Sequence, residues 1–158
     1  MSASSTLVNL DTAKQLTINA QAIIDQSLTK LRQACSKDGK VRSALLDQHQ
    51  WVSFDLARSA AEVSAARHML EYAERLREKS TAEDNLLENQ IAAAYCSEMF
   101  TNLRARIAPR LADFKIEPMQ FHALLDQPAL VAWASEQSCV ENIVSLGDQM
   151  RTSSGHLG

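Results

Sequence analysis

The sequence predicts an all-α fold, an antiparallel helical bundle of three long helices plus short C-terminal helices. Glycine and proline together supply only seven of the 158 residues, and residues 40–108 contain neither type. A β-fold needs turn residues more often than that. Apolar residues also recur at helical steps of three or four along most of the chain. We therefore expect one bundle domain at residues 11–149, a disordered N-terminus at residues 1–10 and a flexible tail at residues 150–158.

The first helix is expected to run from Asp11, as its N-cap, to Ser36. Gly39 is expected to end it by adopting the left-handed backbone conformation. One apolar stripe predicts the face that packs in the core. It consists of Leu10, Ala13, Leu16, Ala20, Ile24, Leu28, Leu31 and Cys35.

The second helix carries the most regular pattern, a seam of strict four- and three-residue steps over four heptads. Three members of this seam, Ser59, Ala66 and Ala73, are small, so we expect a neighbouring helix to approach closely there. The whole seam consists of Leu45, His49, Val52, Leu56, Ser59, Val63, Ala66, Leu70 and Ala73.

A second apolar stripe lies beside this seam, so we expect the helix to be covered on two sides. The remaining polar positions include Arg58–Glu62 and Glu71–Arg75 at i,i+4 spacing, which we interpret as a solvated face. The second stripe consists of Phe54, Ala61, Ala65, Met69, Tyr72 and Leu76.

The third helix is expected to open with a capping box of Ser80 and Glu83. Pro109 should end or kink it, because proline lacks the backbone N–H that a helix interior needs. Its apolar positions are Leu87, Ile91, Tyr95, Met99, Leu103, Ile107 and Leu111.

Three short helices are predicted to follow. Pro118 and Pro128 each suit the first turn of a helix. The last helix is expected over Ser138–Leu146, with Glu141 completing a capping box and Gly147 ending it. Residues 101–115 are basic and residues 116–158 acidic, so we also hypothesise ion pairing between them, tested at Arg110 and Asp126.

Bulk composition bounds the class of protein. The net charge of −3 argues against a nucleic-acid binder, which normally carries a basic surplus. No apolar run approaches the roughly 18 residues of a membrane span. Cys35, Cys96 and Cys139 are widely spaced, which is typical of reduced thiols and predicts a cytoplasmic protein.

The sequence predicts no catalytic residue and no metal ligand. None of His49, His68, His122 and His156 has a glutamate three residues before it, as a helical-bundle metal site would require. We expect His49 to lie in the core, and a core-facing Cys96 to be unreactive. Trp51 and Trp133 are expected to pack in the core or at its rim.

The second and third helices resemble the C-terminal helical-bundle domain of the acyl-CoA dehydrogenase family. Residues 54–57 (FDLA), 61–67 (AEVSAAR) and 72–73 (YA) are similar to the central helix of that domain, and Gln48 and Gln50 to the glutamine before it. Residues 92–99 (AAAYCSEM) are similar to the next family helix. The match rests on the order of Glu62, Arg67, Tyr72, Ser97 and Glu98 within residues 48–100.

The flavin-binding and catalytic motifs of the family are not matched. Residues 36–40 lack the aromatic residue of its Arg-x-x-Phe-Gly segment, and Ala93 replaces a lysine. Pro109 and residues 112–113 stand where the family has a glutamine and two glycines, and no Tyr-Glu-Gly-Thr stretch occurs.

The resemblance implies a bundle domain that contributes an oligomer interface, with self-association through helix faces. It implies FAD only in a full-length member of this oxidoreductase family, where the domain forms part of a flavin and acyl-CoA site. We expect no cofactor for the isolated chain, which is not a complete enzyme by itself, and its cofactor-binding residues are unknown. The alternative is a free-standing helical protein-interaction module without catalytic activity. An independent small enzyme is a third alternative, disfavoured because no acid–base or nucleophile constellation appears.

Overall fold

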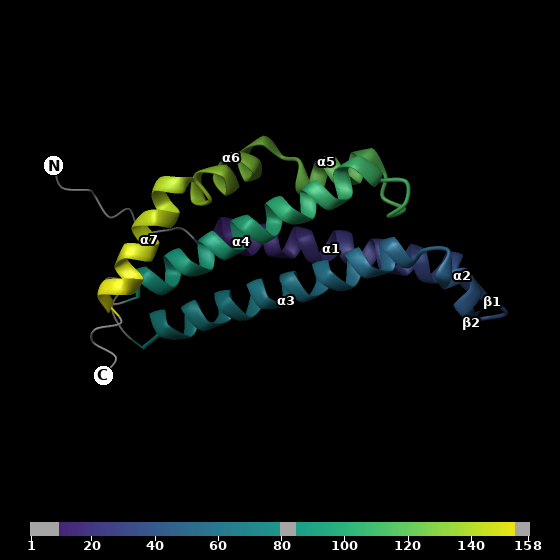
Figure 1. Cartoon of the computed structure of the whole chain (residues 1–158), viewed down its shortest axis with the longest axis horizontal. Coiled ribbons are helices and arrows are strands. Elements are labelled where there is room, and N and C mark those ends of the chain that lie inside the picture. Colours follow the sequence, from purple (N-terminus) through teal and green to yellow (C-terminus); the bar gives the residue numbers. More distant parts are fainter. Residues whose placement is uncertain (1–9, 80–84, 154–158) are drawn as a thin grey trace.

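The computed structural model describes residues 10–79 and 85–153, which form a helical bundle with one small hairpin (Figure 1). The predicted all-α class is confirmed. The long helices are α1, α3 and α4, and the strands β1 and β2 form the hairpin. In chain order the elements are α1 (Leu10–Ala34), β1 (Ser36–Lys37), β2 (Lys40–Val41), α2 (Ser43–Asp47), α3 (Gln50–Arg77), α4 (Leu86–Ile107), the 3-10 helix η1 (Ala108–Arg110), α5 (Pro118–Leu125), α6 (Pro128–Gln137) and α7 (Val140–Ser153).

The three long helices pack against one another in pairs, and α5 and α6 lie over α1 and α4 (Figure 1). The small residues Ala66 and Ala73 are fully buried, so the seam of α3 faces the core as predicted. It packs with side chains such as Phe100 of α4 and Ile24 of α1. The buried residues of α3 are Val52, Leu56, Ser59, Val63, Ala66, Leu70 and Ala73.

Polar side chains of α1 attach the segment that follows α4. The buried Ser27 Oγ donates a 2.6 Å hydrogen bond to the carbonyl oxygen of Phe114, and Asn19 Nδ2 donates one of 2.8 Å to that of Leu124. These bonds satisfy two backbone carbonyl oxygens that lie at or beyond the end of a helix. They help to hold α5 against α1.

The first helix ends earlier than predicted, and Gly39 is not its terminator. Gly39 (φ 73°) and Asp38 (φ 53°) form the two-residue turn of the hairpin, in which Ser36 pairs with Val41. An Asp-Gly turn with two left-handed residues matches the twist of antiparallel strands. The prediction that Leu28 packs in the core is also wrong, because this side chain is 43% exposed.

The second predicted helix is broken near its start. His49 has non-helical backbone angles (φ −118°, ψ 22°) and is half-buried, so it is not a core histidine. Heptad spacing reports which side chains share a face, but it does not establish that the backbone is continuous.

The second stripe of α3 is covered only in part, with Met69 half-buried against the core. Phe54 is 65% exposed and Tyr72 is 52% exposed, so the prediction of cover on two sides is wrong. The main neighbours of α3 are α1 and α4, which pack on its seam side and leave Phe54 and Tyr72 exposed. Trp51 is also exposed instead of packed, whereas Trp133 is half-buried against the core.

The proline predictions are confirmed. Helix α4 ends at Ile107 and Pro109 lies in η1, while Pro118 and Pro128 open α5 and α6. Asn85 is the N-cap residue of α4, and the predicted capping box at Ser80 and Glu83 lies outside the described residues.

The last helix differs from its prediction at both ends. Ser138 is the C-cap of α6 and donates from Oγ to the carbonyl oxygen of Ala134, so it does not cap α7. Helix α7 continues through Gly147 to Ser153. A glycine costs only about 1 kcal/mol in a helix interior, and the apolar pattern continues on both sides of it.

The predicted charge pairing holds between segments but not between the named residues. Asp126 pairs with Arg104, whereas Arg110 pairs with Asp55 of α3 at 2.6 Å. On α3, Arg58 does pair with Glu62, but that carboxylate is largely buried and is not part of a solvated face.

Candidate functional site

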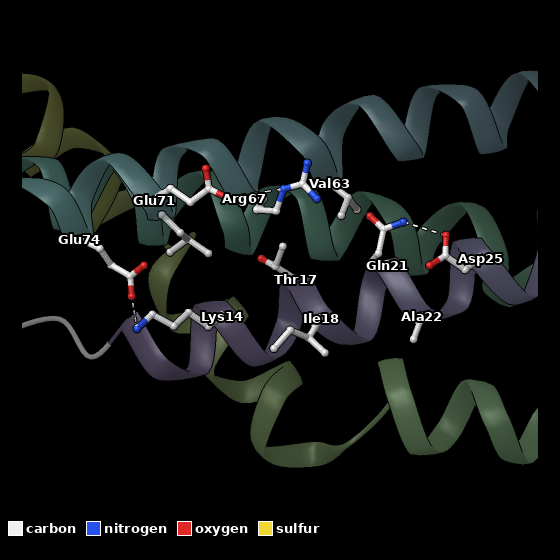
Figure 2. Close-up of a pocket in the computed structure, with 11 residues that line it drawn as sticks. Lys14, Thr17, Ile18, Gln21, Ala22, Asp25, Val63, Arg67, Glu71 and Glu74 are labelled. Carbon is white, nitrogen blue, oxygen red and sulfur yellow. Dashed lines mark hydrogen bonds and ion pairs between the residues drawn. The ribbon is translucent and has the colours of Figure 1, made fainter.

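A groove of about 460 Å³ runs along the outer side of the contact between α1 and α3 (Figure 2). Helix α4 packs on the core side of both helices, and α5 and α6 lie over α1 and α4, so none of these helices fills the groove. The residues that line it are Lys14, Thr17, Ile18, Gln21, Ala22, Asp25, Val63, Arg67, Leu70, Glu71 and Glu74.

The floor of the groove is apolar. Val63 and Leu70 of α3 are 1% and 4% exposed there, whereas Ile18 of α1 is 62% exposed. Ile18 and Ala22 are one helical turn apart, on an edge of α1 that lies outside its buried stripe.

Charged residues form the rim. Lys14 Nζ pairs with a carboxylate oxygen of Glu74 across one end of the groove, and Arg67 Nε lies 3.8 Å from Glu71 Oε1. The hydrogen bond to Glu74 raises the pKa of Lys14 above its ordinary value of 10.5, so this lysine stays charged at neutral pH. At the other end, the exposed Asp25 accepts a 2.9 Å hydrogen bond from Gln21. The site therefore combines an apolar floor with charges of both signs.

A second apolar pocket, of about 310 Å³, lies further along the same pair of helices. The exposed Leu28 of α1 lines it, together with Val41 of the hairpin and Leu46 of α2. Its remaining lining residues are Leu31, Arg32, Cys35, Ser53, Leu56, Ala57 and Ala60. Apolar surface thus follows the open side of α1 and α3 well beyond the groove itself.

The cysteines are unpaired, and none of them lines the groove. Cys96 is fully buried, and burial raises the pKa of its thiol to about 11, although a weak contact from Thr17 Oγ1 opposes this shift. Such a thiol is unreactive at neutral pH, and its burial agrees with the prediction that Cys96 faces the core. Cys35 is buried and Cys139 is half-buried.

Nor do the histidines assemble a site. His68 is exposed and its Nδ1 lies 2.7 Å from the carbonyl oxygen of Ser64, while His122 Nδ1 lies 3.6 Å from Asp126. Within residues 10–79 and 85–153, no group of three or more His, Cys, Asp or Glu side chains is placed to hold a metal ion. His156 lies outside the described residues.

The residues on which the family resemblance rests are not brought together as one site. Glu62 pairs with Arg106, and the buried Ser97 donates a hydrogen bond within its own helix. Arg67 lines the groove, whereas Tyr72 is more than half exposed.

The positions that the resemblance places near a flavin do not fit that cofactor. Pro109 has neither a backbone N–H nor a polar side chain, and it lies exposed in η1. Ala112 offers no polar side chain either, and Asp113 would bring a negative charge toward the phosphates. The hairpin at residues 36–40 lacks the aromatic side chain as well.

Comparison of the chain with protein-family models, curated proteins and solved structures finds no match. None of the described helices is both long enough and apolar enough to cross a membrane. The fold and the groove thus define a helical bundle with an open groove whose lining is apolar and charged. The sequence analysis did not predict this groove. The feature that could have indicated it is Ile18, an apolar residue of α1 that lies outside the predicted apolar stripe, one helical turn from Lys14 and from Ala22.

Proposed function

We propose that this chain is a helical protein-interaction module that acts by binding, and that the groove between α1 and α3 receives an amphipathic helix of a partner protein. The observation that carries this proposal is the open apolar floor around Ile18, enclosed by a charged rim.

The shape and length of the groove favour a helix as the bound element. Its lining spans Lys14 to Asp25 on α1 and Val63 to Glu74 on α3, each about 16 Å at 1.5 Å per residue. That is three turns of helix. Laying an amphipathic helix into an apolar groove is a recurring mode of recognition, in which anchors at i, i+3 or i+4 and i+7 fill the floor.

The chemistry of the lining favours binding over catalysis. Four of its five ionisable side chains are paired with one another, Lys14 with Glu74 and Arg67 with Glu71, and the fifth, Asp25, accepts a hydrogen bond from Gln21. A nucleophile beside a base, which a hydrolytic or transfer reaction needs, is not among the lining residues.

The acyl-CoA dehydrogenase resemblance supplies a second candidate, a bundle domain that forms a subunit interface. The observation in its favour is that α3, the helix that carries the resemblance, exposes Phe54 and Tyr72 on the side away from the core. Flavin binding is a separate role within this candidate function, independent of the subunit interface. It is tested by titrating the full chain with FAD at micromolar concentration, where stoichiometric binding supports it and no binding opposes it.

The groove is tested by titrating the isotope-labelled full chain with a designed 14-residue amphipathic helix that carries leucines at i, i+4, i+7 and i+11. We expect the largest NMR shift changes at backbone amides of Lys14–Asp25 and Val63–Glu74. Ile18→Glu should weaken binding by about tenfold or more, because it places a charge on the apolar floor.

Phe54→Glu is the matched control, because Phe54 is as exposed as Ile18 but lies on the outward side of α3. This variant should bind the peptide as the unchanged chain does. Shift changes centred on Phe54 and Tyr72, or none at all, would contradict the proposal.

A further inference from the structure

The second apolar pocket, of about 310 Å³, lies between α1 and α3 beside the hairpin, and it shares no lining residue with the groove. Its wall on α1 consists of Leu28 and the residues three, four and seven positions further on, which is the spacing of one helix face. Its wall on α3 has the same spacing from Ser53. Because Ser53, Ala57 and Ala60 are small, the two helices leave space between them at this level.

The interior of this pocket is aliphatic, and part of it is open to water. Leu31 and Leu56 are 4% and 1% exposed, whereas Leu28 of α1 is 43% exposed. Val41 of β2 and Leu46 of α2 close the pocket from the hairpin side and are 49% and 38% exposed. A hydrocarbon that enters the pocket covers these three exposed side chains, and its binding is favourable in proportion to the apolar area removed from water.

Arg32 is the one lining residue of this pocket that carries a charge. Its guanidinium forms no ion pair and no hydrogen bond with any residue that the structure describes. In this it differs from Lys14 and Arg67 of the groove, which are both paired with glutamates. Residues 30–42 also hold five basic side chains and one acidic side chain, so the local field favours an anion.

Ser53 adds a hydroxyl group that the chain itself leaves unused. Its Oγ is buried at the α3 wall and has no hydrogen-bond partner among the described residues. A buried hydroxyl without a partner costs free energy, which an oxygen atom of a ligand would recover. The polar groups of the pocket therefore favour a ligand with acceptor oxygens, and a carboxylate fits a guanidinium with two parallel hydrogen bonds.

We propose that this pocket binds a small apolar carboxylate, whose hydrocarbon part lies between α1 and α3 and whose carboxylate pairs with Arg32. The volume lies at the lower end of the range for small-molecule sites, about 300–1,000 Å³, so the ligand is small. The pocket is separate from the groove, and this inference does not depend on the function proposed for the groove.

The test is a titration of the isotope-labelled full chain with octanoate up to about 10 mM, a range that covers weak ligands. We expect the largest NMR shift changes at the backbone amides of Cys35 and Val41. Nuclear Overhauser contacts should join the octanoate chain to the methyl groups of Leu28, Leu46 and Leu56. Hexanoate should bind about fivefold more weakly or worse, because each buried CH₂ group contributes to affinity.

Arg32→Gln tests the charge. Arg32 is exposed, so the variant should keep the helical circular-dichroism spectrum of the unchanged chain. It should bind octanoate about tenfold more weakly, whereas 1-octanol, which has the same chain and no charge, should bind both proteins equally. Arg75→Gln is the matched control, because Arg75 is an exposed arginine of α3 that lines neither the pocket nor the groove.

Ala57→Leu tests the apolar interior. Ala57 lines the pocket but is exposed, so a larger side chain there occupies the space of the ligand without entering the core. Octanoate should bind this variant about tenfold more weakly or worse. Ala61→Leu makes the same change at an exposed position of α3 outside the pocket and should leave binding unchanged.

Three outcomes overturn the inference. The first is no shift change in the pocket at the highest octanoate concentration. The second is equal affinity for octanoate and 1-octanol, or an equal loss of octanoate binding in Arg32→Gln and Arg75→Gln. The third is a set of shift changes centred on Lys14–Asp25 and Val63–Glu74, which would assign the carboxylate to the groove.

Discussion

Arg106 of α4 and Glu62 of α3 form a two-armed ion pair. Arg106 Nη1 donates to Glu62 Oε2 and Nη2 to Oε1, each at 2.7 Å, and Nη1 also donates to Ser59 Oγ at 2.9 Å. The two side chains are only 13% and 21% exposed. Arginine and carboxylate match geometrically in this arrangement, so the pair fixes how α3 and α4 lie along each other. Arg58 of α3 donates to the same carboxylate at 3.0 Å.

We predict that Glu62→Gln lowers the free energy of unfolding at pH 7 by about 1.5–3 kcal/mol, the range for hydrogen bonds to charged groups. Burial by itself raises the pKa of Glu62, but the hydrogen bonds from Arg106 and Arg58 outweigh it and hold the pKa below its ordinary value of 4.5. A carboxyl group with a lowered folded-state pKa stabilises the fold above its unfolded-state pKa, and this contribution is lost as the pH falls through the folded-state pKa.

The difference between the unchanged chain and Glu62→Gln should therefore be constant from pH 7 to about pH 5 and should narrow below pH 4.5. Urea unfolding at a series of pH values measures it. Glu71→Gln is the control, because its pair with Arg67 is exposed and contributes under about 1 kcal/mol. Equal losses for both variants would contradict the prediction.

Ala66 tests the close approach of helices at the seam. It is fully buried on α3, so Ala66→Leu should overpack the contact and lower the free energy of unfolding by about 1–3 kcal/mol. Ala61→Leu makes the same change at an exposed position of the same helix and should alter stability by less than about 0.5 kcal/mol. Thermal melting of the two variants gives the comparison, and an unchanged melting temperature for Ala66→Leu would show that the seam tolerates a larger side chain.

The sequence was sufficient for features that depend on local chemistry and strict periodicity. The burial of Leu56, Val63 and Leu70 follows from heptad spacing, and the start of α5 at Pro118 follows from the fixed φ of proline. The helix class follows from the scarcity of turn residues. These signals lie within one element and need no knowledge of its neighbours.

The groove could not be predicted in the same way, because it depends on which sides of α1 and α3 remain uncovered. Ile18 and Leu28 are both apolar residues of α1, and only the placement of α5 and α6 decides which surface stays open. The sequence also could not predict which arginine pairs with Asp126. Arg104 and Arg110 are six residues apart in a charge-rich segment, and the packing of the helices decides which of them lies near Asp126. The predicted last helix stops at Leu146 because glycine often follows the end of a helix. Glycine also occurs inside helices, and α7 continues through Gly147 to Ser153.

The three cysteines should differ in reactivity toward a thiol reagent such as DTNB. Cys139 is half-buried and should react first, whereas Cys35 and Cys96 are 1% or less exposed and should react only when the chain unfolds. For Cys96 the raised pKa of about 11 lowers the thiolate fraction at neutral pH further. Absorbance should report one fast thiol in the folded chain, and Cys139→Ser should remove that phase. Rapid reaction of all three thiols would contradict the burial of Cys35 and Cys96.

The same substitution at two glycines should have opposite effects. Gly147 lies inside α7 with helical backbone, and a Cβ there meets nothing within 4 Å, so Gly147→Ala should stabilise α7 by about 0.5–1 kcal/mol. Gly39 is equally open, but its φ of +73° is the left-handed conformation, which costs a residue with a Cβ about 1–2 kcal/mol. Gly39→Ala should therefore destabilise the hairpin.

Amide hydrogen exchange measures both effects locally. Protection of α7 amides should rise in Gly147→Ala, and protection of the Arg42 amide, which donates to the Cys35 carbonyl at 2.9 Å beside the hairpin, should fall in Gly39→Ala. Gly39→Asn is the control, because asparagine tolerates the left-handed region better than alanine does and should lose less protection. If Gly39→Ala and Gly147→Ala changed protection in the same direction, backbone conformation would not be what distinguishes these two positions.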